Sequence, residues 1–247
     1  SYRKIGKELD KMNKTIGIVG GMGPLATCDL YQKIIQVTQA DKDQEHVRVC
    51  IDGNTRIPDR TAAILHKGRD PLPQMIKSAV RLEGMGADVL IMPCNPAHYF
   101  YKKLLPFVDI PFLNVLEETA DAAVKMGITK AGLLATDGTV KSGVYEKAFQ
   151  ERGISLELPA KEEQESVMEL IYDGVKAGNY SLDTKKFERA MDKLLQRGAQ
   201  VLVLGCTELP VAFQRWKFTQ PALDPTLVLA SRAVQFVGVK VKEQMRF

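Results

Sequence analysis

The sequence predicts an α/β protein of two similar Rossmann-like lobes, each built around a mostly parallel sheet. Short runs rich in Val, Ile and Leu alternate with longer amphipathic patterns along the chain. One stretch of the first half also recurs in the second half. The 247 residues, 45% hydrophobic and 26% charged, are enough for two lobes of roughly 100 residues that each bury a core.

The short apolar runs predict the strands in chain order. The strongest span residues 15–20, 47–52, 88–92, 131–135 and 200–204, and weaker ones lie near 112–113, 154–157 and 222–223. Helical patterns lie between them, such as the face formed by Phe187, Ala190, Met191, Leu194 and Leu195. Because helices separate the strands, we expect parallel pairing with helices covering the sheets.

An internal repeat predicts the domain boundaries. Gly86–Cys94 aligns without gaps to Gly198–Cys206, at an offset of 112 residues. Looser matches pair residues 14–19 with 130–134 and residues 111–114 with 221–224. The repeat predicts one lobe over residues 13–115 and a second over 116–225, with a last helix (226–247) that packs back on the first. We expect two four-stranded parallel sheets related by a pseudo-twofold axis, with the active site in the cleft between the lobes.

Composition narrows the function classes. The net charge is only +4, basic and acidic residues are interspersed, and aromatics make up 7%, so a nucleic-acid partner is not expected. The longest uncharged stretch has 13 residues and contains two prolines, whereas a membrane span needs about 20 apolar residues. Residues 1–14 lack the apolar core of a signal peptide, which predicts a cytoplasmic protein. We expect residues 1–11 to be an extension ahead of a natural start at Met12.

The four cysteines are spaced too far apart for a zinc site or a disulfide framework. Cys28 and Cys50 are assigned to packing, on the first helix and the second strand. Cys94 and Cys206 each fall just after a strand, at equivalent positions of the repeat. Ligands of open parallel sheets bind outside the carboxyl ends of strands. The two thiols are therefore predicted to approach a shared cleft from opposite sides.

A pair of opposed thiols suits a two-base reaction. Inverting a stereocentre by proton removal requires one group that takes the proton from one face and another that delivers a proton to the opposite face. The reference pKa of cysteine, about 8.5, lets a modest influence from helix N-termini or cations keep one thiolate and one thiol in the same site. For a single cysteine at a strand end, plain burial is the commoner role.

The residues after the two cysteines offer hydrogen bonds to a carboxylate. Asn95 has an amide donor, and Thr207 has a hydroxyl at an expected helix start, where anions are favoured. Helix capping is the alternative role for both. Glu208 is equally consistent with a catalytic role and with stabilisation of the helix dipole.

The two cysteine segments, residues 91–98 (IMPCNPAH) and 202–210 (LVLGCTELP), resemble the signatures of the cofactor-independent aspartate/glutamate racemase family. Within it, the segments 20–27 (GGMGPLAT) and 54–61 (NTRIPDRT) resemble aspartate racemase. The resemblance runs from about Lys14 to the C-terminal helix. It implies a racemase of two similar α/β domains that needs no pyridoxal phosphate or other cofactor and no metal, and that forms a homodimer.

The resemblance also implies roles for single residues. Cys94 and Cys206 would be the acid/base pair that interconverts the L and D enantiomers of an amino acid, probably a dicarboxylic one such as aspartate. Arg60 and Lys176 would bind the substrate carboxylates; a surface ion pair with Asp59 and a solvated helix end are their alternative roles. The implied substrate-binding set is Met22, Arg60, Asn95, Pro96, Thr139, Lys176, Thr207 and Glu208.

One position departs from the family pattern. Pro96 stands where the family has Thr or Ser, so a hydroxyl and a backbone donor are lost. We expect weaker catalysis or a changed substrate as the consequence. His98 keeps the family residue type and is interpreted as a helix-start histidine that orients the loop.

Two alternatives remain open at this point. The first is a racemase of glutamate or of another amino acid. The second is an NAD-dependent oxidoreductase, because Gly21-Met22-Gly23-Pro24-Leu25-Ala26 satisfies the G-x-G-x-x-G/A pattern after a strand, with Asp52 ending the next strand. That short pattern leaves both cysteine segments unexplained.

Overall fold

The structure, a computed structural model, describes residues 14–247 and divides them into two compact units. The N-terminal unit contains the described residues up to Glu118 together with Thr226–Phe247, and the C-terminal unit contains Thr119–Pro225. Helix α6 (Val115–Lys125) crosses the first boundary, and α12 (Pro225–Phe236) begins at the second. Within residues 14–247, no helix has the length and apolar character needed to cross a membrane.

The N-terminal unit has a parallel sheet in the order β2-β1-β3. Its strands are β1 (Thr15–Gly20), β2 (Arg48–Gly53) and β3 (Val89–Ile91). The fourth strand expected near residues 112–113 is reduced to one parallel bridge, between Leu90 and Phe112. Leu90 donates its N–H to Pro111 and accepts from Leu113, so the segment reaches the sheet but runs beside it for a single pair.

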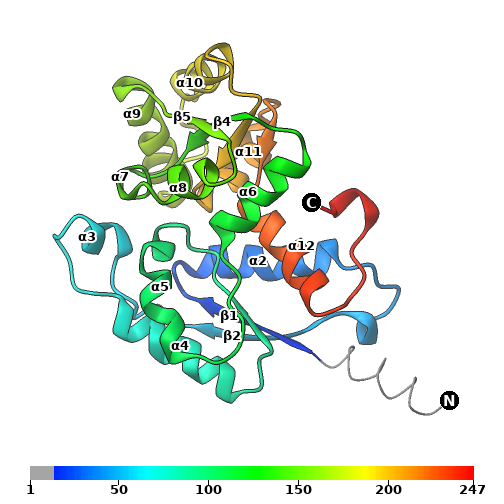
Figure 1. The fold of residues 1–247 in the computed structure, drawn as a ribbon. Coiled ribbons are helices and arrows are strands. Elements are labelled where there is room, and N and C mark those ends of the chain that lie inside the picture. Colours follow the sequence, from blue (N-terminus) through cyan, green and yellow to red (C-terminus); the bar gives the residue numbers. More distant parts are fainter. Residues whose placement is uncertain (1–13) are drawn as a thin grey trace. The chain divides into compact units, whose positions relative to one another are not determined.

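Helices cover both faces of this sheet (Figure 1). A Cβ added to Gly17 would meet Leu82 of α4, whereas one added to Gly20 would meet Thr27 of α2. Because alternate residues of a strand point to opposite faces, α4 and α2 lie on opposite sides of β1. The helices are α2 (Pro24–Val37), α3 (Arg60–Ile64), α4 (Leu72–Gly84) and α5 (Tyr101–Leu104), with 3₁₀ turns at Asp43–Glu45, Pro96–Phe100, Leu105–Phe107 and Glu243–Met245.

The end of the chain returns to the end of α2. Lys242 donates its backbone N–H to Val37, Gln39 donates to Lys240, and Thr38 pairs with Val241 in an antiparallel bridge. These contacts place the segment after α12 in the N-terminal unit.

The C-terminal unit has a four-stranded parallel sheet in the order β5-β4-β6-β7. Its strands are β4 (Lys130–Leu134), β5 (Ser155–Glu157), β6 (Val201–Leu204) and β7 (Ala222–Leu223). Its helices are α7 (Asp137–Ser142), α8 (Val144–Gln150), α9 (Lys161–Glu169), α10 (Lys185–Gln196) and α11 (Glu208–Trp216). A buried cluster that includes Leu134, Val167, Phe187, Met191 and Leu204 joins this sheet to α9, α10 and the segment between them.

The sequence repeat reappears as repeated packing. In the first unit, Gly17 of the central strand is approached by Leu82, Ala87 and Leu90. In the second unit, Gly132 is approached by Leu194, Ala199 and Leu202, each 112 residues further along the chain. A side chain larger than hydrogen would collide with these groups, so both sheets require glycine there to let the helix and the next strand approach.

The helical pattern over residues 161–176 is interrupted. We expected one helix ending at Lys176, but α9 ends at Glu169 and Leu170–Lys176 forms a π-helical segment, η4. Val167, Leu170 and Ile171 are buried as the pattern predicts, whereas Val175 is only partly buried. The wider turn changes the direction in which the last residues point, and such segments are frequent at functional sites.

Candidate active site

Strand order fixes where each sheet can bind a ligand. In both units the second strand pairs on one side of the first and the third strand pairs on the other side. The connections after the first and third strands therefore diverge and leave a crevice at their carboxyl ends. The loop after β1 carries Met22 and the loop after β3 carries Cys94, whereas the corresponding segments after β4 and β6 carry Thr139 and Cys206.

In the N-terminal unit, Cys94 is buried and packs in an apolar cluster with Met22, Ile57 and Ile64. Ile57 and Ile64 flank Arg60 in the sequence. Burial of these two isoleucines therefore holds the segment of Arg60 beside the loops of Met22 and Cys94.

Arg60 is the first residue of α3, and Asp59 caps this helix by accepting a hydrogen bond from the Ala62 N–H. The Nη1 of Arg60 donates to the carbonyls of Ile57, at 3.3 Å, and Pro58, at 3.0 Å. Its Nε is buried and has no hydrogen-bond partner among the described residues. Asp59 is thus a capping residue here, and the guanidinium retains donors that a carboxylate can accept from.

The loop after Cys94 is tied down by His98. The Nδ1 of His98 lies 2.9 Å from the Cys94 carbonyl, and the Val115 N–H donates to its Nε2 at 3.3 Å. Because Nε2 accepts, the proton lies on Nδ1 and the ring is neutral. Burial lowers the pKa of His98 to about 4. His98 therefore orients the cysteine loop against the start of α6, as the sequence predicted.

Asn95 and Pro96 follow Cys94 directly. Asn95 is buried at the start of the 3₁₀ turn Pro96–Phe100, and its side chain makes no capping hydrogen bond to that turn. Pro96 is partly exposed at the first position of the turn, where its missing N–H leaves no turn hydrogen bond unmade.

In the C-terminal unit, three side chains form a connected polar group that we call the Cys206 relay: Cys206, Glu208 and Lys176. The thiol of Cys206 donates to Glu208 Oε2, with 2.9 Å between Sγ and oxygen. Lys176, the last residue of η4, lies with its Nζ 3.6 Å from Glu208 Oε1 and over the ring of Tyr172 at 4.7 Å. Thr207 also donates its hydroxyl to Glu208, at 3.1 Å.

The electrostatics of this relay keep Cys206 protonated. Burial, followed by the negative charge and hydrogen bond of Glu208, raises the pKa of Cys206 well above its ordinary value, and Lys176 offsets part of this effect. Glu208 begins α11, where the helix dipole stabilises its carboxylate. A buried thiol whose proton already points at a defined acceptor is suited to donate that proton.

Thr139 and Tyr145 also belong to the C-terminal unit. Thr139 is fully buried and its hydroxyl lies 3.2 Å from that of Thr136. The sequence analysis missed Tyr145, which is fully buried and whose pKa is raised by burial and by the charges of Asp224 and Cys206. Tyr145 looks like an ordinary core residue of an amphipathic helix. The available signal was Asp224, which occupies the repeat position of Asn114.

Two sequence assignments need correction. Cys28 is exposed on α2 and does not pack in a core, because it lies on the outward face of that helix, whereas Cys50 packs partly buried against the apolar cluster of the N-terminal unit. Gly21 of the G-x-G-x-x-A pattern has a φ of 87° and approaches the backbone of Asn54 so closely that a Cβ would lie 2.3 Å from its carbonyl carbon. Contact with the neighbouring segment therefore accounts for this glycine without a dinucleotide.

Residues 14–247 contain no group of three or more His, Cys, Asp or Glu side chains arranged to hold a metal ion. The polar groups present are instead hydrogen-bond donors, two cations and two thiols. Such groups can bind carboxylates and move protons.

Comparisons with known proteins agree with this chemistry. Residues 19–233 match the Asp/Glu/hydantoin racemase family. The structure is similar to Picrophilus torridus aspartate racemase, with a TM-score of 0.83 and 30% identity over 94% of this chain and 97% of that chain. The broad specificity amino-acid racemase RacX of Bacillus subtilis is 26% identical over 89% of this chain and 96% of its own length. Glutamate racemase of Desulforudis audaxviator is 27% identical over 81% and 73%.

The match covers both cysteine loops, both sheets and the first helical turns of α12. The resemblance found in the two cysteine segments is thereby confirmed, as is the α/β class with two parallel sheets. The chain belongs to the Asp/Glu/hydantoin racemase family and is an amino-acid racemase, an isomerase.

Proposed function

We propose that this racemase inverts aspartate without pyridoxal phosphate, by moving the Cα proton between Cys94 and Cys206. The observation that carries the proposal is the equivalent placement of the two thiols. Each follows the third strand of its sheet, in the connection that borders the ligand crevice. Two thiols built into matching positions provide one proton carrier for each face of a substrate that contacts both units.

In the direction that begins with a Cys94 thiolate, Cys94 takes the proton from Cα and becomes a thiol. The Cys206 thiol then gives its proton to the opposite face of the carbanion and becomes a thiolate. The enzyme holds one thiol and one thiolate before and after the step, so atoms and charge balance. The hydrogen bond from Cys206 to Glu208 supports this assignment of the resting acid, because it holds the thiol in its protonated form.

We propose that Arg60 binds one substrate carboxylate through its guanidinium. A second carboxylate would be bound near Lys176, whose ammonium group is shared with Glu208. Met22, Asn95, Pro96, Thr139 and Thr207 complete the proposed lining. Similarity to an aspartate racemase supports aspartate as the substrate, whereas similarity to a broad specificity racemase and to a glutamate racemase keeps other amino acids in the test.

The test is exchange in D₂O. L-Aspartate is incubated with the protein in the absence of pyridoxal phosphate, and the α-proton signal is followed by NMR together with chiral analysis. A two-base reaction forms D-aspartate that carries deuterium at Cα, while the remaining L-aspartate keeps its proton at early times. Early transfer of protium into the product would indicate a single base. Glutamate and a panel of other amino acids follow, and absence of exchange with all of them would refute the proposal.

We also propose that the racemase is a homodimer formed through α2 and the edge strand β2. A hollow of about 340 Å³ on this face is lined without any charged side chain, by Pro24, Thr27, Cys28, Tyr31, Gln32, Ile35, Ile51 and Gly53. Leu25, on the same helix, is 85% exposed. A protruding leucine next to an apolar hollow is self-complementary, which is the property that a twofold interface requires.

A further inference from the structure

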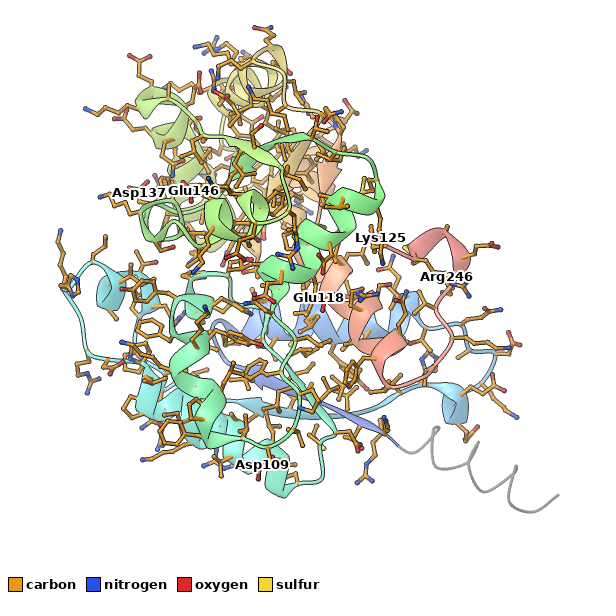
Figure 2. The ribbon with its side chains drawn as sticks, viewed as in Figure 1. Asp109, Glu118, Lys125, Asp137, Glu146 and Arg246 are labelled. Atoms are coloured by element: carbon orange, nitrogen blue, oxygen red, sulfur yellow. The ribbon has the colours of Figure 1, made fainter. Side chains whose placement is uncertain are left out.

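We propose that the C-terminal unit contains a separate effector site for an organic cation, in a cavity of about 780 Å³ between α7, α9 and η4. We call it the α7–α9 cavity. It is lined by Asp137, Val140, Lys141, Lys161, Gln164, Glu165, Met168, Glu169, Tyr172 and Asp173. None of these residues belongs to the Cys206 relay, and Asp137 is labelled on α7 in Figure 2.

The lining presents hydrogen-bond acceptors. It contains four carboxylates and two ammonium groups in a protein whose net charge is positive. Glu165, Glu169 and Asp173 form no salt bridge with any residue in the described part of the chain, residues 14–247. A cavity with unneutralised carboxylates favours a cation over an anion.

A second observation is the state of Gln164. Its amide nitrogen donates to the carbonyl of Ala135, at 2.9 Å, and to Asp137, at 2.8 Å. Its amide oxygen is buried and accepts no hydrogen bond from any described residue. Because a buried acceptor without a donor is unfavourable, an N–H group of a ligand would be stabilised there.

Apolar groups complete the site. Val140, Met168 and the ring of Tyr172 lie among the polar side chains. An alkyl chain can pack on these groups while its ammonium ends meet the carboxylates, so the chemical class that fits is an aliphatic diamine. Methionine adapts readily to a flexible alkyl chain.

The cavity is linked to the reaction through η4. Tyr172 and Asp173 line the cavity, and Lys176 of the same π-helical segment lies over the Tyr172 ring and beside Glu208. A ligand that orders Tyr172 and Asp173 therefore acts on the residue that balances the charge of Glu208. This consequence for turnover rests on the proposed two-thiol reaction, whereas binding itself does not.

The experiment is isothermal titration calorimetry of the full chain with 1,5-diaminopentane, compared with 1,5-pentanediol at the same millimolar concentrations. We expect saturable binding of the diamine that weakens with added salt, and no binding of the diol. Glu169→Gln combined with Asp173→Asn should weaken binding at least several-fold, and Val140→Trp should abolish it by filling the cavity. Glu162→Gln, an exposed residue of α9 outside the cavity, is the matched control and should leave binding unchanged.

Cys206→Ala separates the two proposals, because it removes a proposed proton carrier and leaves the cavity intact. We expect this variant to bind the diamine as the wild type does, and saturating diamine to change kcat or KM in the active protein. Absence of saturable binding, equal binding to Val140→Trp, loss of binding in Cys206→Ala, or unchanged kinetics at saturation would each overturn the effector site. Failure of racemisation with intact diamine binding would instead refute the proposed reaction alone.

Discussion

The thiol of Cys206 donates a hydrogen bond to the carboxylate of Glu208, with 2.9 Å between Sγ and Oε2. This contact gives the C-terminal half of the site a protonated acid in the resting state. Lys176 lies on the other carboxylate oxygen of Glu208, at 3.6 Å. A carboxylate between a thiol and an ammonium group sets the proton affinity of the thiol, because each neighbour shifts the charge that the thiolate would meet.

The titration of Cys206 should therefore respond oppositely to two substitutions. Glu208→Gln removes the negative charge, so the pKa of Cys206 should fall, whereas Lys176→Gln removes the offsetting cation, so it should rise. Thiolate absorbance in the ultraviolet, measured against pH in a Cys28→Ala and Cys50→Ala background, reports both shifts. Shifts in the same direction for both variants would contradict the electrostatic account.

Removal of either site thiol should abolish inversion. Cys94→Ala and Cys206→Ala each leave one face of the substrate without a proton carrier, and we expect racemisation to fall by at least about 10²- to 10⁴-fold. Cys28→Ala is the matched control, since Cys28 is exposed on α2 and far from both cysteine loops in the sequence. Chiral analysis of L- and D-aspartate reactions measures the loss. Near wild-type racemisation in either single variant would exclude the two-thiol reaction.

Arg60→Ala should raise KM and lower kcat, because the guanidinium is expected to bind and orient a substrate carboxylate. Loss of one charge-assisted hydrogen-bonded contact corresponds to about 1.5–3 kcal/mol, or about 10- to 150-fold in kcat/KM. Arg60→Lys should recover part of the loss, since it restores the charge without the planar fork. Arg69→Ala, in the exposed stretch after α3, serves as control. Unchanged steady-state kinetics in Arg60→Ala would assign Arg60 to the loop alone.

His98 should make the protein sensitive to acid. Its pKa is about 4 in the folded state and 6.5 in the reference state, so the unfolded chain binds the proton first as pH falls. The stabilisation is complete above pH 6.5 and declines between pH 6.5 and 4, by about 3 kcal/mol in total. Urea unfolding of His98→Gln at several pH values should show a shallower decline. His66→Asn, at an exposed left-handed position, should keep the wild-type pH dependence.

Leu25→Asp should convert the proposed dimer into monomers. The substitution places a charge on a face whose hollow has no charged side chain, so each copy would meet an unpaired carboxylate at the interface. Light scattering after size-exclusion chromatography measures the mass of wild type and variant. Val80→Asp, on the exposed side of α4, is the matched surface control. A wild type that elutes as a monomer at micromolar concentration would rule out this interface.

Sequence alone predicted most of the fold because the repeat and the period of the apolar residues are local signals. The strands that begin at Thr15, Ser155 and Ala222 lie where the apolar runs predicted them. The strand expected at Phe112 was over-predicted, because its length depends on how far the segment follows its neighbour in the sheet. Cys94 and Cys206 were found from their position after strands, which sequence order fixes.

What the sequence by itself determined is therefore the α/β class, the repeat of two units and the identity of the two candidate thiols. Tertiary structure alone decided that residues 170–176 form a π-helical segment and that Lys176 meets Glu208 beside Cys206. It also placed Tyr145 in the electrostatic neighbourhood of Cys206. The physical reason is that periodicity records which side of an element is buried, whereas the partners of a polar side chain depend on how separate elements pack.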